Sequence, residues 1–257
     1  MMQTTAPRRR HALITGGATG IGAAIAHRMA ADGVAVTLLG RRTSVLQAMA
    51  ATLPDAAFVT ADVTDRAQVD AAFAAARAVH GPIDILVCNA GAAESARFEK
   101  QGFDVWRRLM AVNLDALHHC GQNALPDLRA STAGRMVVIA STAGLKGYAY
   151  SVAYSAAKHG AIGMVRALAL ELAATNVTVN AVCPGFADTE IVAEAVAKLV
   201  EKTGRTAEQA RSDLAKFNPQ GRLIDPDEVA DAVAWLCAAS SRSITGQAIA
   251  VAGGEVM

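Results

Sequence analysis

The sequence predicts an α/β protein in which helices cover both faces of a doubly wound, parallel, seven-stranded sheet. Short apolar runs alternate with longer helical patterns along the chain. Of the 257 residues, 53% are hydrophobic but only 4% are aromatic, which is typical of aliphatic strands packed against alanine-rich helices. The length suits one domain of this class, and neither a repeat nor a linker divides the chain. We therefore expect a single domain over residues 1–257.

Seven apolar runs are expected to form the strands. They lie near residues 11–15, 34–39, 56–60, 83–88, 135–140, 177–183 and 247–251. Because helical patterns separate these runs, hairpins cannot join them, and right-handed crossovers would make the strands parallel. We expect a Rossmann-like sheet with the strand order 3-2-1-4-5-6-7, which binds ligands beyond the carboxyl ends of its strands.

The segment 186–225 is longer than an ordinary connection between a strand and a helix. Its pattern predicts two short helices, at about 189–202 and 206–217, with a break at Gly204. A long insertion at the ligand end of a sheet is a candidate substrate lid, and a crossover that is merely long is the alternative.

The charge balance argues against several classes of partner. The formal net charge is +1, so no global field would attract nucleic acid or an anionic membrane, and a small molecule is the expected ligand. The apolar run after Arg8, Arg9 and Arg10 is too short for a signal peptide or a membrane span, so we expect a cytoplasmic protein. We expect no metal site. The four cysteines are widely spaced, and the adjacent His118 and His119 would point about 100° apart on a helix.

A glycine-rich turn follows the first predicted strand and leads into a helical pattern. It reads Thr15-Gly-Gly-Ala-Thr-Gly-Ile-Gly22, with the spacing T-G-x-x-x-G-x-G. Glycines allow a tight turn and a close approach to a pyrophosphate, and a helix N-terminus favours the anionic phosphates. The turn therefore predicts a dinucleotide site, although a purely structural turn is the alternative.

Further motifs follow in order along the chain. Asn89-Ala90-Gly91 follows the fourth predicted strand, and Asn113, 24 residues after Asn89, is expected to begin a helix. Ser141 follows the fifth strand, and Tyr154-x-x-x-Lys158 begins thirteen residues later. Pro184-Gly185 then precedes Thr189. This series resembles the short-chain dehydrogenase/reductase family over nearly the whole chain, so we expect an oxidoreductase acting on CH–OH groups.

Hydride transfer to a carbonyl explains why such residues would be needed. The alkoxide that forms must receive a proton from a positioned acid. Tyr154 and Lys158 are four residues apart and would share one helix face, so the ammonium could lower the pKa of the phenol, ordinarily about 10. Ser141 would hold the substrate oxygen by a hydrogen bond. A pair on an exposed helix, without a catalytic role, is the alternative.

The resemblance implies a role for each motif residue. Asn113, Ser141, Tyr154 and Lys158 would form the catalytic tetrad, with Asn113 holding a water that connects Lys158 to solvent and Lys158 also reaching the cofactor ribose. The residues expected at the cofactor are Thr15, Gly16, Thr19, Gly20, Ile21, Gly22, Arg41, Arg42, Asp62, Val63, Asn89, Ala90, Gly91, Tyr154, Lys158, Pro184, Gly185 and Thr189.

The end of the second predicted strand indicates which cofactor is used. An acidic residue there accepts hydrogen bonds from the ribose of NAD(H), but this chain has Gly40 followed by Arg41 and Arg42. Arginine can bind a 2′-phosphate through paired hydrogen bonds, so we favour NADP(H) over NAD(H). The alternative is that the arginines only solvate a helix start. Asp62 resembles the family's adenine-contacting aspartate, and a simple helix cap is its alternative role.

The sequence constrains the substrate less than the reaction. The loop 142–151 is expected to form a mostly apolar wall with one cation, Lys146, which favours a 3-oxoacyl thioester or a bulky hydrophobic ketone. The run 198–204 resembles 3-hydroxybutyrate dehydrogenases, which use NAD, but Ala143 and Ser151 replace polar residues that this branch uses to hold its small hydroxy acid. A catalytically silent cofactor-binding regulator is a further alternative.

The resemblance also implies an assembly. Family members usually form homotetramers through the two long helices, expected here at about 113–130 and 152–175.

Overall fold

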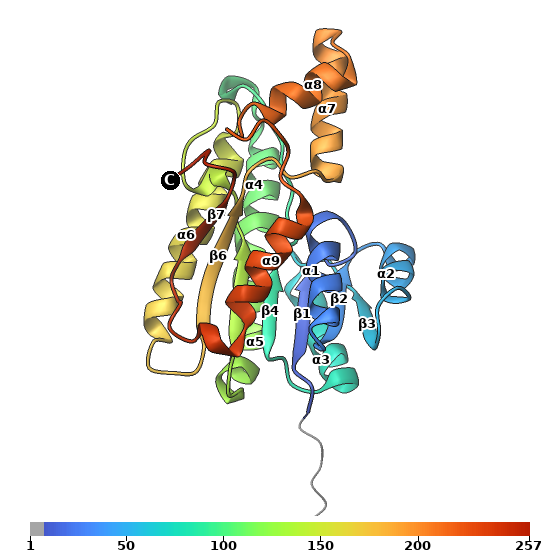
Figure 1. Cartoon of the computed structure of the whole chain (residues 1–257), viewed down its shortest axis with the longest axis vertical. Coiled ribbons are helices and arrows are strands. Elements are labelled where there is room, and N and C mark those ends of the chain that lie inside the picture. Colours follow the sequence, from blue (N-terminus) through green and yellow to red (C-terminus); the bar gives the residue numbers. More distant parts are fainter. Residues whose placement is uncertain (1–7) are drawn as a thin grey trace, which may run out of the picture.

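The computed structural model describes residues 8–257 and contains a parallel sheet with the order β3-β2-β1-β4-β5-β6-β7 (Figure 1). The strands are β1 His11–Thr15, β2 Ala35–Gly40, β3 Ala56–Thr60, β4 Ile85–Cys88, β5 Arg135–Ile139, β6 Thr178–Pro184 and β7 Ala248–Val251. All six neighbouring pairs are parallel. The predicted strand order is therefore confirmed, and the predicted strand ends differ by no more than about two residues, the usual uncertainty of such boundaries.

Helices cover both faces of this sheet. The α-helices are α1 Gly20–Ala31, α2 Thr43–Ala50, α3 Arg66–His80, α4 Phe103–Met110, α5 Ala116–Ala130, α6 Val152–Glu171, α7 Glu190–Thr203, α8 Ala207–Ala215 and α9 Pro226–Cys237. Short 3₁₀ turns occur at η1 Phe98–Lys100, η3 Thr142–Gly144 and η4 Ala239–Ser241. Among these described helices, none combines the length and the apolar character needed to cross a membrane.

The core has two layers, one on each face of the sheet. One contains Phe73 of α3, Leu117 of α5 and Val165 of α6, whereas the other contains Met29 of α1 and Val233 of α9. Strands β1, β4, β5 and β6 are buried along their whole length, which explains why their sequences are continuous apolar runs rather than alternating ones. Because these strands are buried on both faces, their carboxyl ends are held in place, and so are the starts of the loops that follow them.

The helix expected to begin at Asn113 begins earlier. Chain 103–130 is one continuous run, in which a π-helical turn, η2 Ala111–Asp115, joins α4 to α5. The prediction was wrong because no residue near Asn113 breaks the helical pattern. A π turn is an i→i+5 irregularity that is common at functional sites and has no strong sequence signature.

The segment 186–225 forms the two helices that its pattern predicts. Gly204 separates α7 from α8 with a φ of +68°, a left-handed conformation that favours glycine. At the base of the segment, Ala187 and Ile224 form a parallel bridge, and the amide of Asp188 donates to the carbonyl of Ile224 (2.9 Å). Figure 1 shows α7 and α8 beyond the carboxyl ends of the strands, on top of the main body.

Polar groups close the opposite, amino-terminal end of the sheet. His11 is fully buried, and its ring nitrogens contact the carbonyl of Gly81 (2.9 Å) and the hydroxyl of Thr37 (2.8 Å). Asp84 accepts two hydrogen bonds from the Arg8 guanidinium, at 3.0 and 2.8 Å, and one from the amide of His11 (2.9 Å). This network lies at the end remote from the loops that follow the strands.

Because His11 is buried, protonation of this ring should destabilise the fold. Burial lowers the pKa of His11 below its ordinary 6.5. The unfolded chain therefore binds a proton at a pH where folded His11 stays neutral, and stability should fall as the pH drops below about 6.5. Thermal unfolding between about pH 8 and pH 5 should show this fall, and His11→Gln should make it shallower. The exposed His118→Gln is the control, and equal slopes in all three proteins would contradict the assignment to His11.

Candidate active site

The ends of β1 and β4 are joined through Thr15 and Asn89. The Asn89 amide group donates to the carbonyls of Thr15 (3.0 Å) and Gly16 (3.1 Å). The Thr15 hydroxyl accepts from the backbone amides of Asn89 and Ala90, each at 3.0 Å. These bonds hold the glycine-rich turn against the Asn89-Ala90-Gly91 loop.

The glycine-rich turn has no room for side chains on its inner surface. Gly16 has a φ of +63°, and a Cβ there would lie 2.9 Å from the Asn89 amide nitrogen. A Cβ on Gly22 would collide with the carbonyl oxygen of Gly16. Gly20 has a φ of +51°, and a Cβ there would lie 3.1 Å from Thr189 Cγ2, so the turn meets the loop after β6. The glycine-rich turn near the start of the chain and the motif at residues 184–189 in its second half thus lie side by side.

The N-terminus of α1 is suited to an anion. Thr19 is the N-cap residue but makes no capping hydrogen bond with its side chain, and the first turn contains no acidic residue. By contrast, Asp65 caps α3 by accepting from two backbone amides. The uncapped amides of α1, together with the helix dipole, fit the pyrophosphate of a dinucleotide. The glycine cradle and this helix end therefore agree with the nicotinamide cofactor expected from the sequence.

Lys158 is buried at the centre of the site. Its ammonium donates to the carbonyl of Ile139 at the end of β5 (2.8 Å) and lies 5.7 Å from the centre of the Tyr154 ring. Burial lowers the pKa of Lys158 to about 8. Both side chains lie on one face of α6, as the four-residue spacing predicts.

The pKa of Tyr154 differs from the expectation. Burial raises it above its ordinary value, and the nearby Ser141 hydroxyl only partly opposes the rise. The expected lowering by Lys158 is not found, because the ammonium lies over the ring and is bound to Ile139, and desolvation of the phenolate dominates. The raised pKa therefore keeps Tyr154 protonated at neutral pH.

Asn113 lies in the π turn with its side chain fully engaged. Its amide nitrogen donates to the carbonyls of Ala92 and Leu109, each at 2.9 Å, and its oxygen accepts from the amide of Ala92 (3.3 Å). A Cβ on Gly91 would lie 2.8 Å from the Asn113 oxygen and 3.6 Å from the Lys158 nitrogen. The structure thus brings Asn113, Gly91 and Lys158 together, and the role of Asn113 in holding water stays a prediction.

The loop after β2 presents the two arginines to solvent. Arg41 is 77% exposed and lies 3.9 Å from the Asp62 carboxylate, while Arg42 is 61% exposed and lies 3.4 Å from Glu190. The Asp62 carboxylate also accepts from the amide and the hydroxyl of Thr64. The arginines are therefore free to turn toward a ligand, since exposed ion pairs of this kind contribute little.

The loop after Ser141 is less apolar than its sequence suggests. The Tyr148 hydroxyl contacts the Thr142 hydroxyl (2.7 Å) and donates to the carboxylate of Glu255, which also pairs with the Lys146 ammonium (3.1 Å). Glu255 lies far away in sequence, near the two glycines that follow β7, and no motif pointed to it. The predicted apolar wall survives only in part, through contacts of Tyr148 with Phe186 and Phe217.

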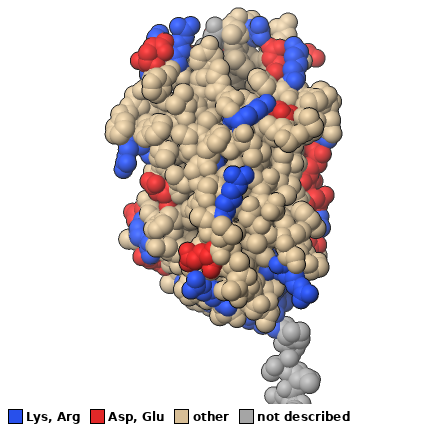
Figure 2. Space-filling model, turned by 90° about the vertical axis from the view of Figure 1, so that its left-hand side faces the viewer, with Lys and Arg blue, Asp and Glu red and all other residues tan. Residues whose placement is uncertain are grey.

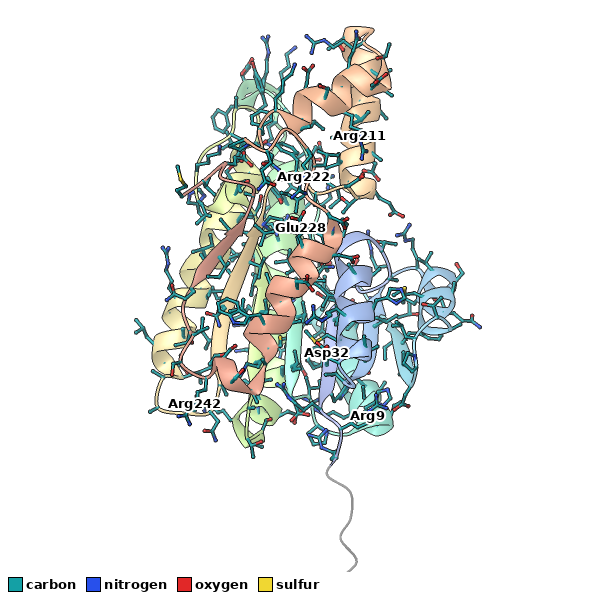
Figure 3. The ribbon with its side chains drawn as sticks, viewed as in Figure 1. Arg9, Asp32, Arg211, Arg222, Glu228 and Arg242 are labelled. Carbon is teal, nitrogen blue, oxygen red and sulfur yellow. The ribbon has the colours of Figure 1, made fainter. Side chains whose placement is uncertain are left out.

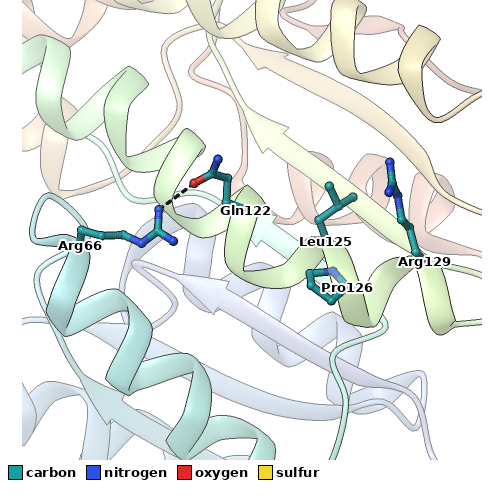
Figure 4. A pocket seen from close by; sticks show the side chains of 5 residues that line it. All are labelled: Arg66, Gln122, Leu125, Pro126 and Arg129. Atoms are coloured by element: carbon teal, nitrogen blue, oxygen red, sulfur yellow. Dashed lines mark hydrogen bonds between the residues drawn. The ribbon is translucent and has the colours of Figure 1, made fainter.

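A shallow groove on the surface of α3 and α5 is separate from these residues. Figure 4 shows the side chains that line it, with Arg66 donating to the Gln122 oxygen. The other lining residues are Leu125, Pro126 and Arg129. None of the residues predicted for catalysis or for the cofactor lines this groove, so we do not assign the reaction to it.

Comparison with known proteins shows the family to which the chain belongs. A sequence model described as short chain dehydrogenase matches residues 10–200. Cis-4-hydroxycyclohexanecarboxylate dehydrogenase of Sinomonas cyclohexanicum is 38% identical over 250 residues, which cover 95% of this chain and 96% of that protein. The granaticin polyketide synthase putative ketoacyl reductase 1 of Streptomyces violaceoruber is also 38% identical over 250 residues, covering 95% of this chain and 92% of that one.

A solved structure agrees with these relatives. The crystal structure of an actinorhodin polyketide ketoreductase variant with NADPH matches with a TM-score of 0.92 and 34% identity, covering 96% of this chain and 97% of that one. The fold and the family match define an oxidoreductase that acts on CH–OH groups or the corresponding ketones. The chain belongs to the short chain dehydrogenase family, and the resemblance inferred from its motifs is confirmed.

The Asn89 hydrogen bonds can be tested with an isosteric substitution. Asn89→Asp would place a carboxylate oxygen against the carbonyls of Thr15 and Gly16, so we expect a loss of about 1–3 kcal/mol in the free energy of unfolding. Denaturant unfolding measures this loss. The exposed Asn176→Asp is the control, and an equal effect of the two substitutions would show that the Asn89 bonds carry no special weight.

Proposed function

We propose that this oxidoreductase interconverts a secondary alcohol and a ketone with NADP(H), and that the ketone is a 3-oxoacyl thioester or a bulky hydrophobic ketone. The observation that carries the proposal is the arrangement at α6. Tyr154 lies beside the Ser141 hydroxyl, and Lys158 lies on the same helix face, next to the Asn89-Ala90-Gly91 loop. The glycine cradle and the helix N-terminus that fit a dinucleotide lie at the same carboxyl end of the sheet.

Each tetrad residue has a role that its contacts support. The reduced nicotinamide, when bound, supplies the hydride. Ser141 donates a hydrogen bond to the substrate oxygen, and Tyr154 gives that oxygen its proton, which suits a phenol whose pKa burial keeps high. Lys158 places a positive charge beside the phenolate that remains, and its pKa of about 8 keeps it largely protonated at neutral pH. Asn113 fixes the loop at Gly91, against which Lys158 packs.

NADP(H) is the favoured cofactor, and NAD(H) is the alternative. Arg41 and Arg42 are exposed at the end of β2, where Gly40 provides no carboxylate to repel a 2′-phosphate. The solved actinorhodin ketoreductase structure was determined with NADPH, which supports the same choice.

The substrate class rests on the loop after Ser141 and on the relatives. Tyr148, Phe186 and Phe217 form an aromatic cluster that suits a bulky ketone. The granaticin relative is named a ketoacyl reductase, which supports a 3-oxoacyl thioester. A small hydroxy acid such as 3-hydroxybutyrate, oxidised with NAD, remains the second candidate, because a D-beta-hydroxybutyrate dehydrogenase of Cupriavidus necator is 34% identical over 252 residues.

We infer that the chain folds as one domain in which α7 and α8 act as a lid over the substrate. The hinge of this lid lies where Ala187 meets Ile224.

We also infer that the protein forms a homotetramer through α5 and α6. Leu170 on α6 is 80% exposed, and Figure 2 shows the side of the molecule that carries α6 as a largely uncharged surface with a few basic side chains near its middle. The cytoplasmic location inferred from the sequence stays a prediction.

Removal of the Tyr154 hydroxyl tests the proposed reaction. We expect Tyr154→Phe to lower kcat by about 10²–10⁴-fold, since a positioned general acid contributes that much. Consumption of NADPH with a panel of ketones and 3-oxoacyl thioesters measures this change. Tyr150→Phe, at an exposed position just before α6, is the control. Equal rates for wild type and Tyr154→Phe would rule out the mechanism.

Reversal of the charge at Arg41 tests the cofactor preference. Arg41→Asp should weaken the binding of NADPH about tenfold or more, because a hydrogen bond to a charged group contributes about 1.5–3 kcal/mol. NADH binding should change much less. Fluorescence titration measures both affinities, with Arg242→Asp as a control of equal charge change near the amino-terminal end of β7 (Figure 3). An unchanged ratio of the two affinities would remove Arg41 from the phosphate site.

A further inference from the structure

Glu255 is a buried carboxylate at the junction of several segments that meet beside Ser141. Its side chain is 2% exposed. One oxygen, Oε1, accepts from the Tyr148 hydroxyl and lies 3.1 Å from the Lys146 ammonium. The preceding glycines, Gly253 and Gly254, pack against Asn218 and Pro219, at the end of the segment that carries α7 and α8. Three segments therefore meet at Glu255: the loop after Ser141, the end of the segment that carries α7 and α8, and the chain after β7.

The second carboxylate oxygen of Glu255, Oε2, has no hydrogen-bond partner among the described residues. Among residues 8–257, nothing donates a hydrogen bond to Oε2, although this atom is shielded from solvent. Both nearby donors, Lys146 and Tyr148, are used on Oε1. An unsatisfied buried acceptor is costly, and more so when it is charged, so such groups in folded proteins generally have a partner.

The free oxygen faces the loop after β6. A Cβ on Gly185 would lie 3.0 Å from Oε2, so the close approach depends on glycine at this position. Phe186, the next residue, contacts the Tyr148 ring and the Phe217 ring. Oε2 thus lies at the aromatic cluster, on the side of the Pro184-Gly185 loop.

A chain of hydroxyls connects Glu255 to the reacting end of the site. Tyr148 donates to Glu255 and can therefore only accept from Thr142, whose hydroxyl lies 2.7 Å away. Thr142 directly follows Ser141, so the carboxylate lies two side chains away from the residue proposed to hold the carbonyl oxygen. This separation suits a substrate group remote from the carbonyl rather than the carbonyl itself.

We propose that Glu255 is a specificity-determining residue whose free oxygen accepts a hydrogen bond from a hydroxyl group carried by the ketone substrate. The inference rests on the proposed function and narrows its substrate class to hydroxylated ketones. A carboxylate at the same place on the substrate is repelled by Glu255, and Lys146 offsets this repulsion only in part because it is already paired. The site therefore prefers a hydroxyl to a carboxylate on otherwise similar ring ketones.

Matched ketones test this preference. The named substrate of the Sinomonas relative is a substituted cyclohexane, so the probes are 4-hydroxycyclohexanone, 4-methylcyclohexanone and 4-oxocyclohexanecarboxylate. Wild type should show the highest kcat/KM for the hydroxy ketone and the lowest for the carboxylate. Glu255→Gln should reduce the ratio of hydroxy to methyl ketone about tenfold and raise the relative rate for the carboxylate. Glu171→Gln, on the exposed end of α6, is the control and should leave both ratios as in wild type.

A binding measurement separates this inference from the proposed reaction. Calorimetry of the same ketones with the Tyr154→Phe protein and NADPH should give the same order of affinities, and adding Glu255→Gln should abolish it. If wild type reduces none of the ketones but this order of affinities is found, the proposed reaction fails and the role of Glu255 stands. Reduction of ketones without preference for the hydroxyl, or a preference that survives Glu255→Gln, overturns the inference.

The cofactor is the other possible source of a donor. NADPH affinity measured without substrate should be the same for wild type and Glu255→Gln. A loss of affinity in that titration, with unchanged ketone ratios, would mean that Oε2 accepts from the nicotinamide carboxamide, and the substrate assignment would then be wrong.

Discussion

The hydrogen bonds between Thr15 and Asn89 are the interaction on which the rest of the site depends. They join the carboxyl ends of the two central strands, β1 and β4, and fix the path of the glycine-rich turn. That path sets the direction of α1 and leaves its first amides uncapped. Because Gly20 meets Thr189, the same turn also positions the loop after β6 and, beyond it, the base of α7. A small polar network thus connects the cofactor cradle to the substrate side.

Much of the fold could be predicted from the sequence because its signals are local and repeated. Buried parallel strands read as apolar runs, and crossover helices force the parallel order. The proximity of Tyr154 and Lys158 could also be predicted, since side chains four residues apart on a helix share a face. Gly204 ended α7 as predicted, because a left-handed C-cap favours glycine. In each case one short stretch of sequence contains the whole physical cause.

The features that escaped prediction depend on contacts between distant segments. The π turn at Asn113 is stabilised by bonds to Ala92, 21 residues away, and nothing in its own sequence marks it. The raised pKa of Tyr154 follows from burial, which spacing cannot reveal. Glu255 shows the same limit most clearly. Its partners Lys146 and Tyr148 lie 109 and 107 residues before it, so its neighbourhood exists only in the folded chain.

The long reach of the Thr15–Asn89 contact has a kinetic consequence. The two residues are 74 positions apart, and the chain between their strands contains β2 and β3 with their helices. Parallel pairings of this kind form slowly because chain entropy is lost before contacts compensate for it. The dinucleotide cradle should therefore appear late in refolding. Recovery of cofactor binding after dilution from denaturant would then lag behind the return of helical circular dichroism, which makes the cofactor a reporter of the completed sheet.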